Sequence, residues 1–403
     1  MKKLADRIKE FNKDLLPDMI QLKYKAMLES PFRFFRGTCH LFYEDFASIK
    51  TSPDFPLTWI CGDLHLENFG SFKGNNRMVY FDLNDFDESS LAFVNWEISR
   101  VITSIFVAFD TLKIKSSEAT EMAKLFLETY SRTLSLGKAR YIDPRTAEGV
   151  VKLFLKTVKD RKEKKLAIKQ IDSKSRRYKI KIDNKTHFEL EKGLKKDLIQ
   201  HLSDWVKKTK EWPNHYKVID AAFRVVGTGS IGLKRYLFLL QSIKNDGGLL
   251  LMDMKQGVKS SLAPYNPVPQ PNWDSQATRV ISVKYRMQNI SPALLSTTVF
   301  KDNAYVLQEM QSTADKINFA SIDDQYQCLK QVITDMAVLT ASAQIRSGGI
   351  QKSATIDELM AFGKRTNWQE PLLKYAIKYA KQVKKDYNQF KSDYNSGVYS
   401  TPA

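Results

Sequence analysis

The spacing of apolar residues changes along this chain, and the change restricts the fold class more than any other feature. Between residues 96 and 210 apolar side chains recur at helical intervals. From about residue 216 they form short runs bounded by turn residues, which is typical of strands. Helical spacing returns over residues 325–345 and 372–390. The sequence therefore predicts an α+β protein in which a small antiparallel sheet interrupts a mostly helical part.

Short apolar runs next to Gly, Asn or Pro predict the individual strands. The residues 245–248, Asn-Asp-Gly-Gly, predict a tight hairpin turn between two of them. A helical segment interrupted at Ser30-Pro31 precedes the first strand. The predicted strands are residues 57–61, 78–81, 223–226, 234–240, 249–255 and 303–310.

Length and composition exclude several protein classes. A chain of 403 residues with 43% hydrophobic residues suggests two or three compact units and excludes wholesale disorder. Three widely separated cysteines, Cys39, Cys61 and Cys328, indicate neither a disulfide framework nor a zinc site. The amino terminus lacks the apolar core of a signal peptide, and the apolar stretches are shorter than the about 18 residues that span a bilayer. We therefore expect a cytoplasmic protein without a membrane span.

The chain carries a strong excess of positive charge, with 63 Lys+Arg, 45 Asp+Glu and a net charge of +18. Residues 152–198 hold 17 basic and 7 acidic residues, so 17 − 7 gives +10 of that excess. Such a field attracts anions, including nucleic acid and phosphorylated molecules. A nucleic-acid-binding function is the less favoured hypothesis, because basic runs on helices are usually solvated and this one has no recognition motif.

The segment 62–70, which follows a predicted strand, has the most specific pattern in the chain: Asp63 and Asn68 stand five positions apart. This is the spacing of a kinase catalytic loop, in which the aspartate accepts the proton of the substrate hydroxyl and the asparagine binds Mg²⁺. We predict these roles for Asp63 and Asn68. The alternative is that Asp63 caps a helix.

A second source of metal-binding carboxylates follows at the end of the predicted strand 78–81. Either Asp82 or Asp85 can hold the Mg²⁺ that bridges the ATP phosphates. The hairpin length from Asn68 favours Asp82. The tripeptide Asp-Phe-Asp and its distance to the next helix favour Asp85, so both stay open, and a solvated acidic turn is the alternative to a metal site.

Residues 226–233 contain a Gly-x-Gly-x-x-Gly pattern between two predicted strands. In a dinucleotide-binding fold the last glycine opens a helix, so a loop over nucleotide phosphates suits this context better. An ordinary hairpin that needs glycine at positive φ is the alternative. The predicted phosphate-binding residues of this loop are Gly227, Thr228, Gly229, Ser230 and Gly232.

Lys255 ends the next predicted strand and is the candidate for the lysine that binds the α- and β-phosphates. In kinases a helix glutamate holds this lysine, but between residues 257 and 301 the only acid is Asp274. Either Gln288 substitutes for the glutamate or the pair differs. The strand 303–310 is expected to run into a hinge, where Gln308 and Met310 contact the adenine.

Together these segments resemble the bacterial family known as domain of unknown function 2252, which is itself similar to aminoglycoside phosphotransferases and protein kinases. The resemblance implies a kinase-like two-lobed fold in circularly permuted order, since the catalytic loop precedes the glycine loop. It implies a helical large lobe at residues 1–215, a nucleotide-binding β lobe at 216–317 and completing helices at 318–403. The segments that carry it are residues 30–37, 62–70, 81–88, 96–100, 225–232 and 341–348.

The resemblance also implies that Glu97 and Arg100 brace the catalytic loop. Cys61 and Gln344 stand where such proteins carry histidine. We expect an ATP- and Mg²⁺-dependent phosphotransferase with Asp63 and Lys255 as catalytic residues, acting on a hydroxyl group of an unidentified small-molecule or protein acceptor. Because the helix glutamate is missing, the alternative is a nucleotide-binding pseudokinase or an AMP-transferring enzyme.

Overall fold

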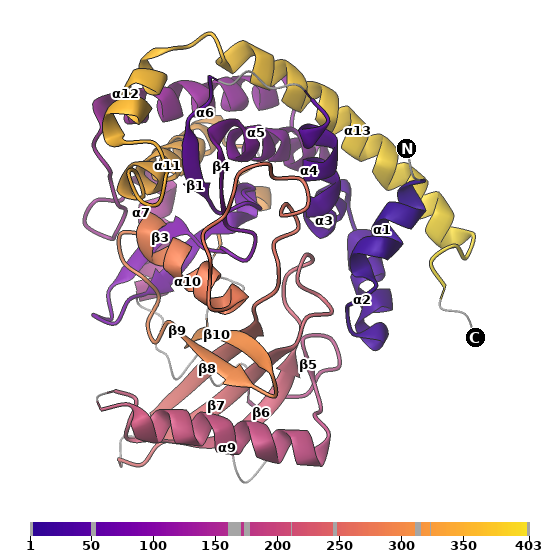
Figure 1. Ribbon diagram of the computed structural model, residues 1–403, viewed down its shortest axis with the longest axis vertical. Coiled ribbons are helices and arrows are strands. Elements are labelled where there is room, and N and C mark those ends of the chain that lie inside the picture. Colours follow the sequence, from indigo (N-terminus) through magenta and orange to yellow (C-terminus); the bar gives the residue numbers. More distant parts are fainter. Residues whose placement is uncertain are drawn as a thin grey trace.

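The computed structural model combines helices with small antiparallel sheets, as the apolar spacing predicted (Figure 1). A six-stranded sheet lies at one end of the molecule, and most helices gather at the other end. The structure describes residues 3–49, 54–159, 171–172, 178–210, 212–244, 248–310, 316–322 and 324–400.

The chain begins with short helices whose starts are set by proline and by a serine cap. Ser30 Oγ accepts a hydrogen bond from Arg33 N at 3.1 Å, and Pro31 occupies the first helical position of α3, where its missing N–H costs nothing. The helices are α1 (Leu4–Asn12), α2 (Pro17–Met27), α3 (Pro31–Gly37) and α4 (Cys39–Ala47).

Two two-stranded sheets follow. The acidic segments 62–70 and 81–88 lie at the ends of their strands and in the connections between them. β1 (Leu57–Ile60) pairs with β4 (Ser90–Phe93), and β2 (Phe69–Lys73) pairs with β3 (Val79–Leu83). The short helix η1 (Leu66–Asn68) joins β1 to β2. β4 runs directly into α5 (Val94–Thr111), which is buried along almost its whole length.

Helices from both ends of the chain pack around α5. α13 packs against α5, whereas α11 and α12 pack against α6. The segments after the large sheet therefore return to the helices that precede it. We call α1–α7 and α11–α13 the helical part; its remaining members are α6 (Ser116–Leu136), α7 (Gly149–Lys159), α11 (Tyr326–Arg346), α12 (Ile356–Lys364) and α13 (Gln369–Asn395).

The large sheet is antiparallel throughout, in the order β5-β6-β7-β8-β10-β9. α9 (Lys192–Lys208) covers its outer face through Leu198, Leu202 and Val206 (Figure 1). We call β5–β10 with α9 the sheet part. Its strands are β5 (His187–Phe188), β6 (Tyr216–Arg224), β7 (Arg235–Ser242), β8 (Leu249–Gln256), β9 (Ser296–Phe300) and β10 (Asn303–Glu309).

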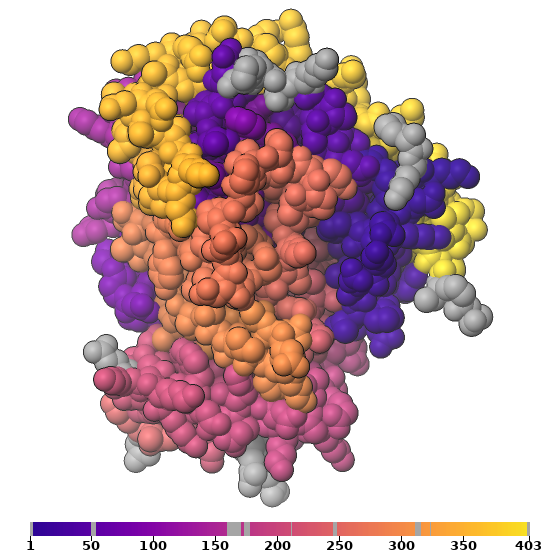
Figure 2. All heavy atoms as spheres, in the orientation of Figure 1, coloured from indigo at the N-terminus to yellow at the C-terminus, as the bar shows by residue number. Residues whose placement is uncertain are grey.

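The segment between β8 and β9 joins the two parts. It contains α10 (Gln276–Met287) and fills the face between the sheet and the helices in Figure 2. Arg279 of α10 donates hydrogen bonds to Asp87 O at 2.7 Å and Ser89 O at 2.5 Å, so α10 is fixed to the β3–β4 connection. The short helix η2 (Phe319–Ser321) leads back into the helical part.

The expected strands are present, although β6 ends at Arg224 and leaves residues 225–226 in the following loop, and the structure adds β2, β4, β5 and β9. The helical spacing of residues 96–210 corresponds to α5, α6, α7 and α9, whereas residues 137–148 and 178–191 are not helical. β5 and α9 belong to the sheet part although they precede residue 216. Residues 245–247 of the expected turn, and 160–170 and 173–177 of the basic stretch, lie outside the described residues. Among the described helices, none is long and apolar enough to cross a membrane.

Candidate active site

A cleft of about 470 Å³ lies between the sheet part and the helical part. Its wall is formed by segments that are far apart in the sequence, including α3, the loop before η1, the β3–β4 connection and the β6–β7 loop. Among its lining residues are the predicted site residues Asp63, Asn68, Asp85, Gly227, Thr228, Gly229, Ser230, Lys255 and Gln308.

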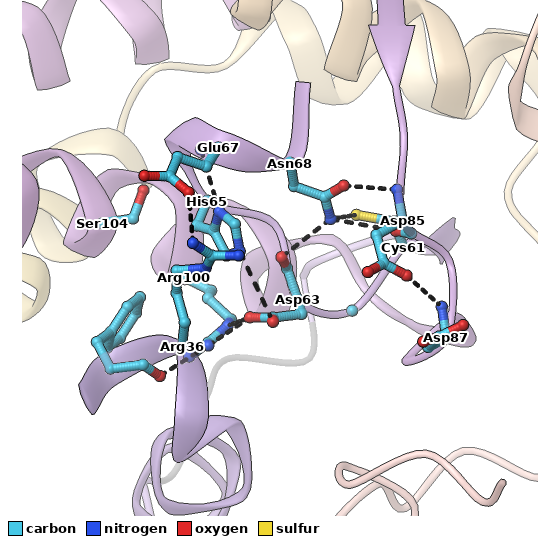
Figure 3. A network of polar contacts seen from close by, with 12 residues as sticks. Arg36, Cys61, Asp63, His65, Glu67, Asn68, Asp85, Asp87, Arg100 and Ser104 are labelled. Atoms are coloured by element: carbon cyan, nitrogen blue, oxygen red, sulfur yellow. Dashed lines mark hydrogen bonds and ion pairs between the residues drawn. The ribbon is translucent and has the colours of Figure 1, made fainter. Parts of the chain in front are cut away.

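Asp63 is held by Arg100, which is fully buried in α5 (Figure 3). Arg100 Nε donates to Asp63 Oδ1 at 2.8 Å, its Nη2 donates to the same oxygen, and Nη2 also donates to Phe35 O at 3.2 Å. Burial raises the pKa of Asp63, although the positive charge of Arg100 opposes this shift. The loop thus presents an oriented carboxylate whose side chain is 21% exposed.

Glu97 fixes the backbone that leads to Asp63. Its Oε1 accepts from Cys61 N at 2.7 Å and from Gly62 N at 3.3 Å, and its Oε2 accepts from Gln344 Nε2 at 3.1 Å. Gly62 has φ +87°, and a Cβ there would lie 2.1 Å from Glu88 O. Glu97 and Arg100 therefore contact the loop in the bracing manner that the resemblance implied.

Asn68 ties the loop of Asp63 to the loop of Asp85 (Figure 3). Its Nδ2 donates to Asp63 O at 3.0 Å and Asp85 O at 3.1 Å, and its Oδ1 accepts from Asp85 N at 2.6 Å. The predicted metal-binding oxygen is thus already engaged with the backbone. His65 shapes the same loop, because its Nδ1 accepts from Glu67 N at 3.1 Å.

The structure separates the two candidate carboxylates of the hairpin. Asp85 lines the cleft, and its side chain is 58% exposed. Burial would raise the pKa of Asp85, but the charges of Lys255, Arg235 and other nearby cations outweigh it and lower the pKa. Asp82 is buried, lies outside the cleft lining and pairs with Arg346 Nη2 at 3.3 Å.

Lys255 projects from β8 into the cleft and forms an ion pair with Asp87, while Asp85 Oδ2 lies 3.8 Å from its Nζ. The interpretation that Gln288 replaces the helix glutamate is wrong, because Gln288 Nε2 donates to Leu83 O at 2.6 Å. The alternative, a different partner, is correct. The carboxylate comes from the β3–β4 connection, and α10 contains no acidic residue that could pair with Lys255.

The β6–β7 loop is bound to the amino-terminal helices. Thr228 Oγ1 accepts from Arg33 Nε at 3.1 Å, and Gly229 O accepts from Lys23 Nζ at 3.1 Å. Gly227 has φ +76°, a conformation that glycine adopts readily. Gly232 does not line the cleft; its O accepts from Leu16 N at 3.0 Å.

The predicted hinge residues separate at the end of β10. Gln308 lines the cleft and accepts a hydrogen bond from Lys284 Nζ at 3.3 Å. Met310 lies outside the cleft lining, and its N–H donates to Leu251 O at 2.9 Å. The backbone N–H of the intervening Glu309 donates to Ala293 O at 2.9 Å, so the N–H groups of Glu309 and Met310 are both engaged within the protein.

The sequence interpretation assigned no role to several cations of the cleft. Burial lowers the pKa of Lys284 to about 8, partly offset by the charge of Asp85. Burial, assisted by repulsion from Arg36, lowers the pKa of Lys316 to about 8. Of the cation cluster at the cleft only Lys255 was predicted from the sequence, and the basic and aromatic segment 32–36 was the other available signal. The cluster comprises Arg33, Arg36, Arg224, Arg235, Lys255, Lys284 and Lys316.

The oxygen ligands at the cleft wall fit a magnesium ion whose remaining ligands are phosphate oxygens and water. Within the described ranges, no group of three or more His, Cys, Asp or Glu side chains is arranged to hold a metal. However, Asn84 Oδ1 is buried without a hydrogen-bond partner among the described residues, next to Asp85 at the cleft wall. A carboxylate and an amide oxygen are hard ligands, and Mg²⁺ usually takes few protein ligands and completes its shell with phosphates and water.

The fold and the cleft define a class: an α+β protein with a cation-lined cleft between a sheet part and a helical part. Residues 15–393 match the model of a family described as uncharacterized protein conserved in bacteria (DUF2252), and the chain belongs to this family. No curated protein and no solved structure matches the chain.

Proposed function

We propose that the protein is an ATP- and Mg²⁺-dependent phosphotransferase with a kinase-like fold in circularly permuted order. The observation that carries the proposal is the convergence of Asp63, Asp85 and Lys255 on one cleft. They come from three separate segments, and the glycine loop 227–230 lines the same cleft. Acids and cations that meet in this way suit the transfer of a phosphoryl group, which depends mainly on positioning and charge neutralisation.

The chain order supports the permutation. The loop with Asp63 precedes the sheet part, and α11–α13 follow the sheet part yet pack against α5 and α6. Joining the chain ends differently would place the sheet part first and the catalytic loop after it, which is the order in kinases. The same spatial roles can survive such reordering, as they do in catalytic triads on unrelated folds.

Each residue has a chemical role in this proposal. Mg²⁺ would neutralise charge on the phosphates and would be held by Asp85 together with the oxygen of Asn84. Asp63 accepts the proton of the acceptor hydroxyl, and its raised pKa makes it a stronger base than an exposed aspartate. Lys255 and Lys284 bind phosphate oxygens, and Gln308 lies beside Lys284.

Isothermal titration with Mg²⁺ and ATP tests the nucleotide site. We expect the wild-type protein to bind ATP more tightly with Mg²⁺ than without it. Asp85→Asn should abolish this difference, because Asp85 lines the cleft, whereas Asp82→Asn should retain it, because Asp82 pairs with Arg346 elsewhere. Circular dichroism verifies that both variants are folded. Absence of nucleotide binding to the wild-type protein would refute the proposal.

A second candidate function keeps the nucleotide but not the phosphoryl transfer. It is favoured by the ion pair of Lys255 with Asp87, which replaces the helix glutamate of kinases, and by the engagement of the Asn68 amide with backbone groups. Mass spectrometry of the products formed during incubation with ATP separates phosphoryl transfer, AMP transfer and binding alone. A gain of phosphate supports phosphotransfer, a gain of AMP supports AMP transfer, and binding without either product indicates a pseudokinase.

A further inference from the structure

A second cavity, of about 290 Å³, lies in the helical part and shares no lining residue with the cleft. It is bounded by the end of α4, residues 54–55 before β1, the first turn of α5, and the end of α12 with the start of α13. Aromatic side chains make up much of its wall, which also contains Asp54, Arg365 and Asn367; the aromatic residues are Phe46, Phe55, Phe362, Trp368 and Tyr375.

Asn95 is the polar group that makes this cavity unusual. It lines the cavity from the first turn of α5 and is fully buried. Neither its Nδ2 nor its Oδ1 has a hydrogen-bond partner among the described residues. The hydroxyl of Tyr375 on the same wall is also buried and lacks a partner in the described part of the chain. Buried polar side chains are nearly always hydrogen-bonded, so these groups are set up for a partner that enters the cavity.

The aromatic wall is held in a defined arrangement. The rings of Phe362 and Trp368 stack with centroids 4.8 Å apart, and those of Phe46 and Tyr375 meet edge to face at 5.0 Å. Trp368 Nε1 donates to Arg365 O at 2.8 Å, which satisfies the indole without a ligand. Flat aromatic surfaces beside the unsatisfied Asn95 amide and the Tyr375 hydroxyl are suited to a planar ring with a polar edge.

We propose that this cavity binds a small aromatic molecule that carries a neutral amide edge, such as a ring carboxamide or a lactam. The Asn95 amide offers N–H donors and a carbonyl acceptor, and an amide edge complements both. A hydrocarbon would satisfy neither group of the Asn95 amide, and a carboxylate would satisfy only its donors and would have to shed its hydration. Arg365 also lines the cavity, but its Nη2 already donates to Asp54 O at 3.0 Å. Engineered apolar cavities of about 150 Å³ hold benzene, so the volume here suits one or two rings.

The test uses the full-length protein and three probes of similar size: benzamide, benzoate and ethylbenzene. Titrations are followed by the NMR signal of the Trp368 indole N–H, identified with the Trp368→Phe variant. We expect benzamide to shift this signal and to bind about tenfold or more tightly than either of the other probes, because it alone satisfies the buried amide. Asn95→Leu, which is close in size, should remove the preference for benzamide while ethylbenzene still binds.

Lys255→Met is the matched control, since it changes the cleft and should leave benzamide binding intact. The two proposals are therefore tested independently. Failure of ATP binding does not contradict benzamide binding in this cavity, and failure of benzamide binding does not contradict the nucleotide site. Equal affinity of the wild-type protein for benzamide and ethylbenzene, or no shift of the Trp368 signal with benzamide, overturns the proposal. These two results come from the wild-type protein, so they decide the matter even if Asn95→Leu does not fold.

Discussion

The two buried lysines of the cleft make a quantitative prediction about nucleotide binding. Lys284 and Lys316 have pKa values lowered to about 8, so each is about half protonated in the free protein at pH 8. A bound polyphosphate favours the charged form of both lysines and raises their pKa values. Binding should therefore take up about one proton in total at pH 8, about 0.2 at pH 7, and more above pH 8. Because binding takes up protons, the affinity for ATP should fall as the pH rises through 8.

The proton count is measured by isothermal titration at pH 8 in buffers that differ in their ionisation enthalpy. The slope of the observed enthalpy against the ionisation enthalpy of the buffer gives the protons taken up. Lys284→Met and Lys316→Met should each remove about half of the uptake. Lys217→Met is the control, because Lys217 is exposed on β6. Tripolyphosphate in place of ATP tests the cation cluster independently of adenine recognition.

One result would refute this reasoning. ATP could bind at pH 8 with a measurable heat but without proton uptake. In that case the phosphates do not lie near Lys284 and Lys316, or these lysines are fully charged in the free protein. If tripolyphosphate binds with proton uptake and ATP does not bind, the cation cluster is correct and the nucleotide assignment is wrong.

Two further predictions concern the loop of Asp63. Arg100→Met leaves the largely buried carboxylate of Asp63 without its cation and should lower the free energy of unfolding by about 3–5 kcal/mol at pH 7. In urea unfolding this loss should be smaller at pH 5 than at pH 7. Without Arg100 the pKa of Asp63 in the folded variant rises further, so the stability of the variant declines as the pH increases. Equal losses at both pH values would contradict this reasoning. Gly62 and Gly349 have similar positive φ values, but an added Cβ clashes with Glu88 O at Gly62 and meets no atom within 4 Å at Gly349. Gly62→Ala should therefore destabilise the protein more than Gly349→Ala. Comparable urea midpoints for the two alanine variants would show that the loop relaxes freely.

Local patterns were sufficient wherever the structure depends on neighbours in the sequence. The apolar run that became β8 (Leu249–Gln256) and the helical spacing that became α11 (Tyr326–Arg346) were predicted within a few residues. The spacing of Asp63 and Asn68 also identified residues that line the cleft. β5 was missed because it is only two residues long and gains its strand character from pairing with β6.

Long-range partners could not be predicted in the same way. The sequence left Asp82 and Asp85 open, and only the hairpin geometry directs Asp85 to the cleft and Asp82 to Arg346. Lys255 pairs with Asp87, although α5–α7, α9 and β5–β7 lie between these two residues in the chain.

The sequence by itself therefore determined the α+β class, the main strands and helices and the acidic loop, because periodicity and turn residues act over a few positions. The tertiary structure decided the partner of Lys255, the depressed pKa values of Lys284 and Lys316 and the unsatisfied amide of Asn95. Each of these depends on burial and on which distant segments meet, and neither burial nor a distant contact is fixed by the residues next to it in the chain.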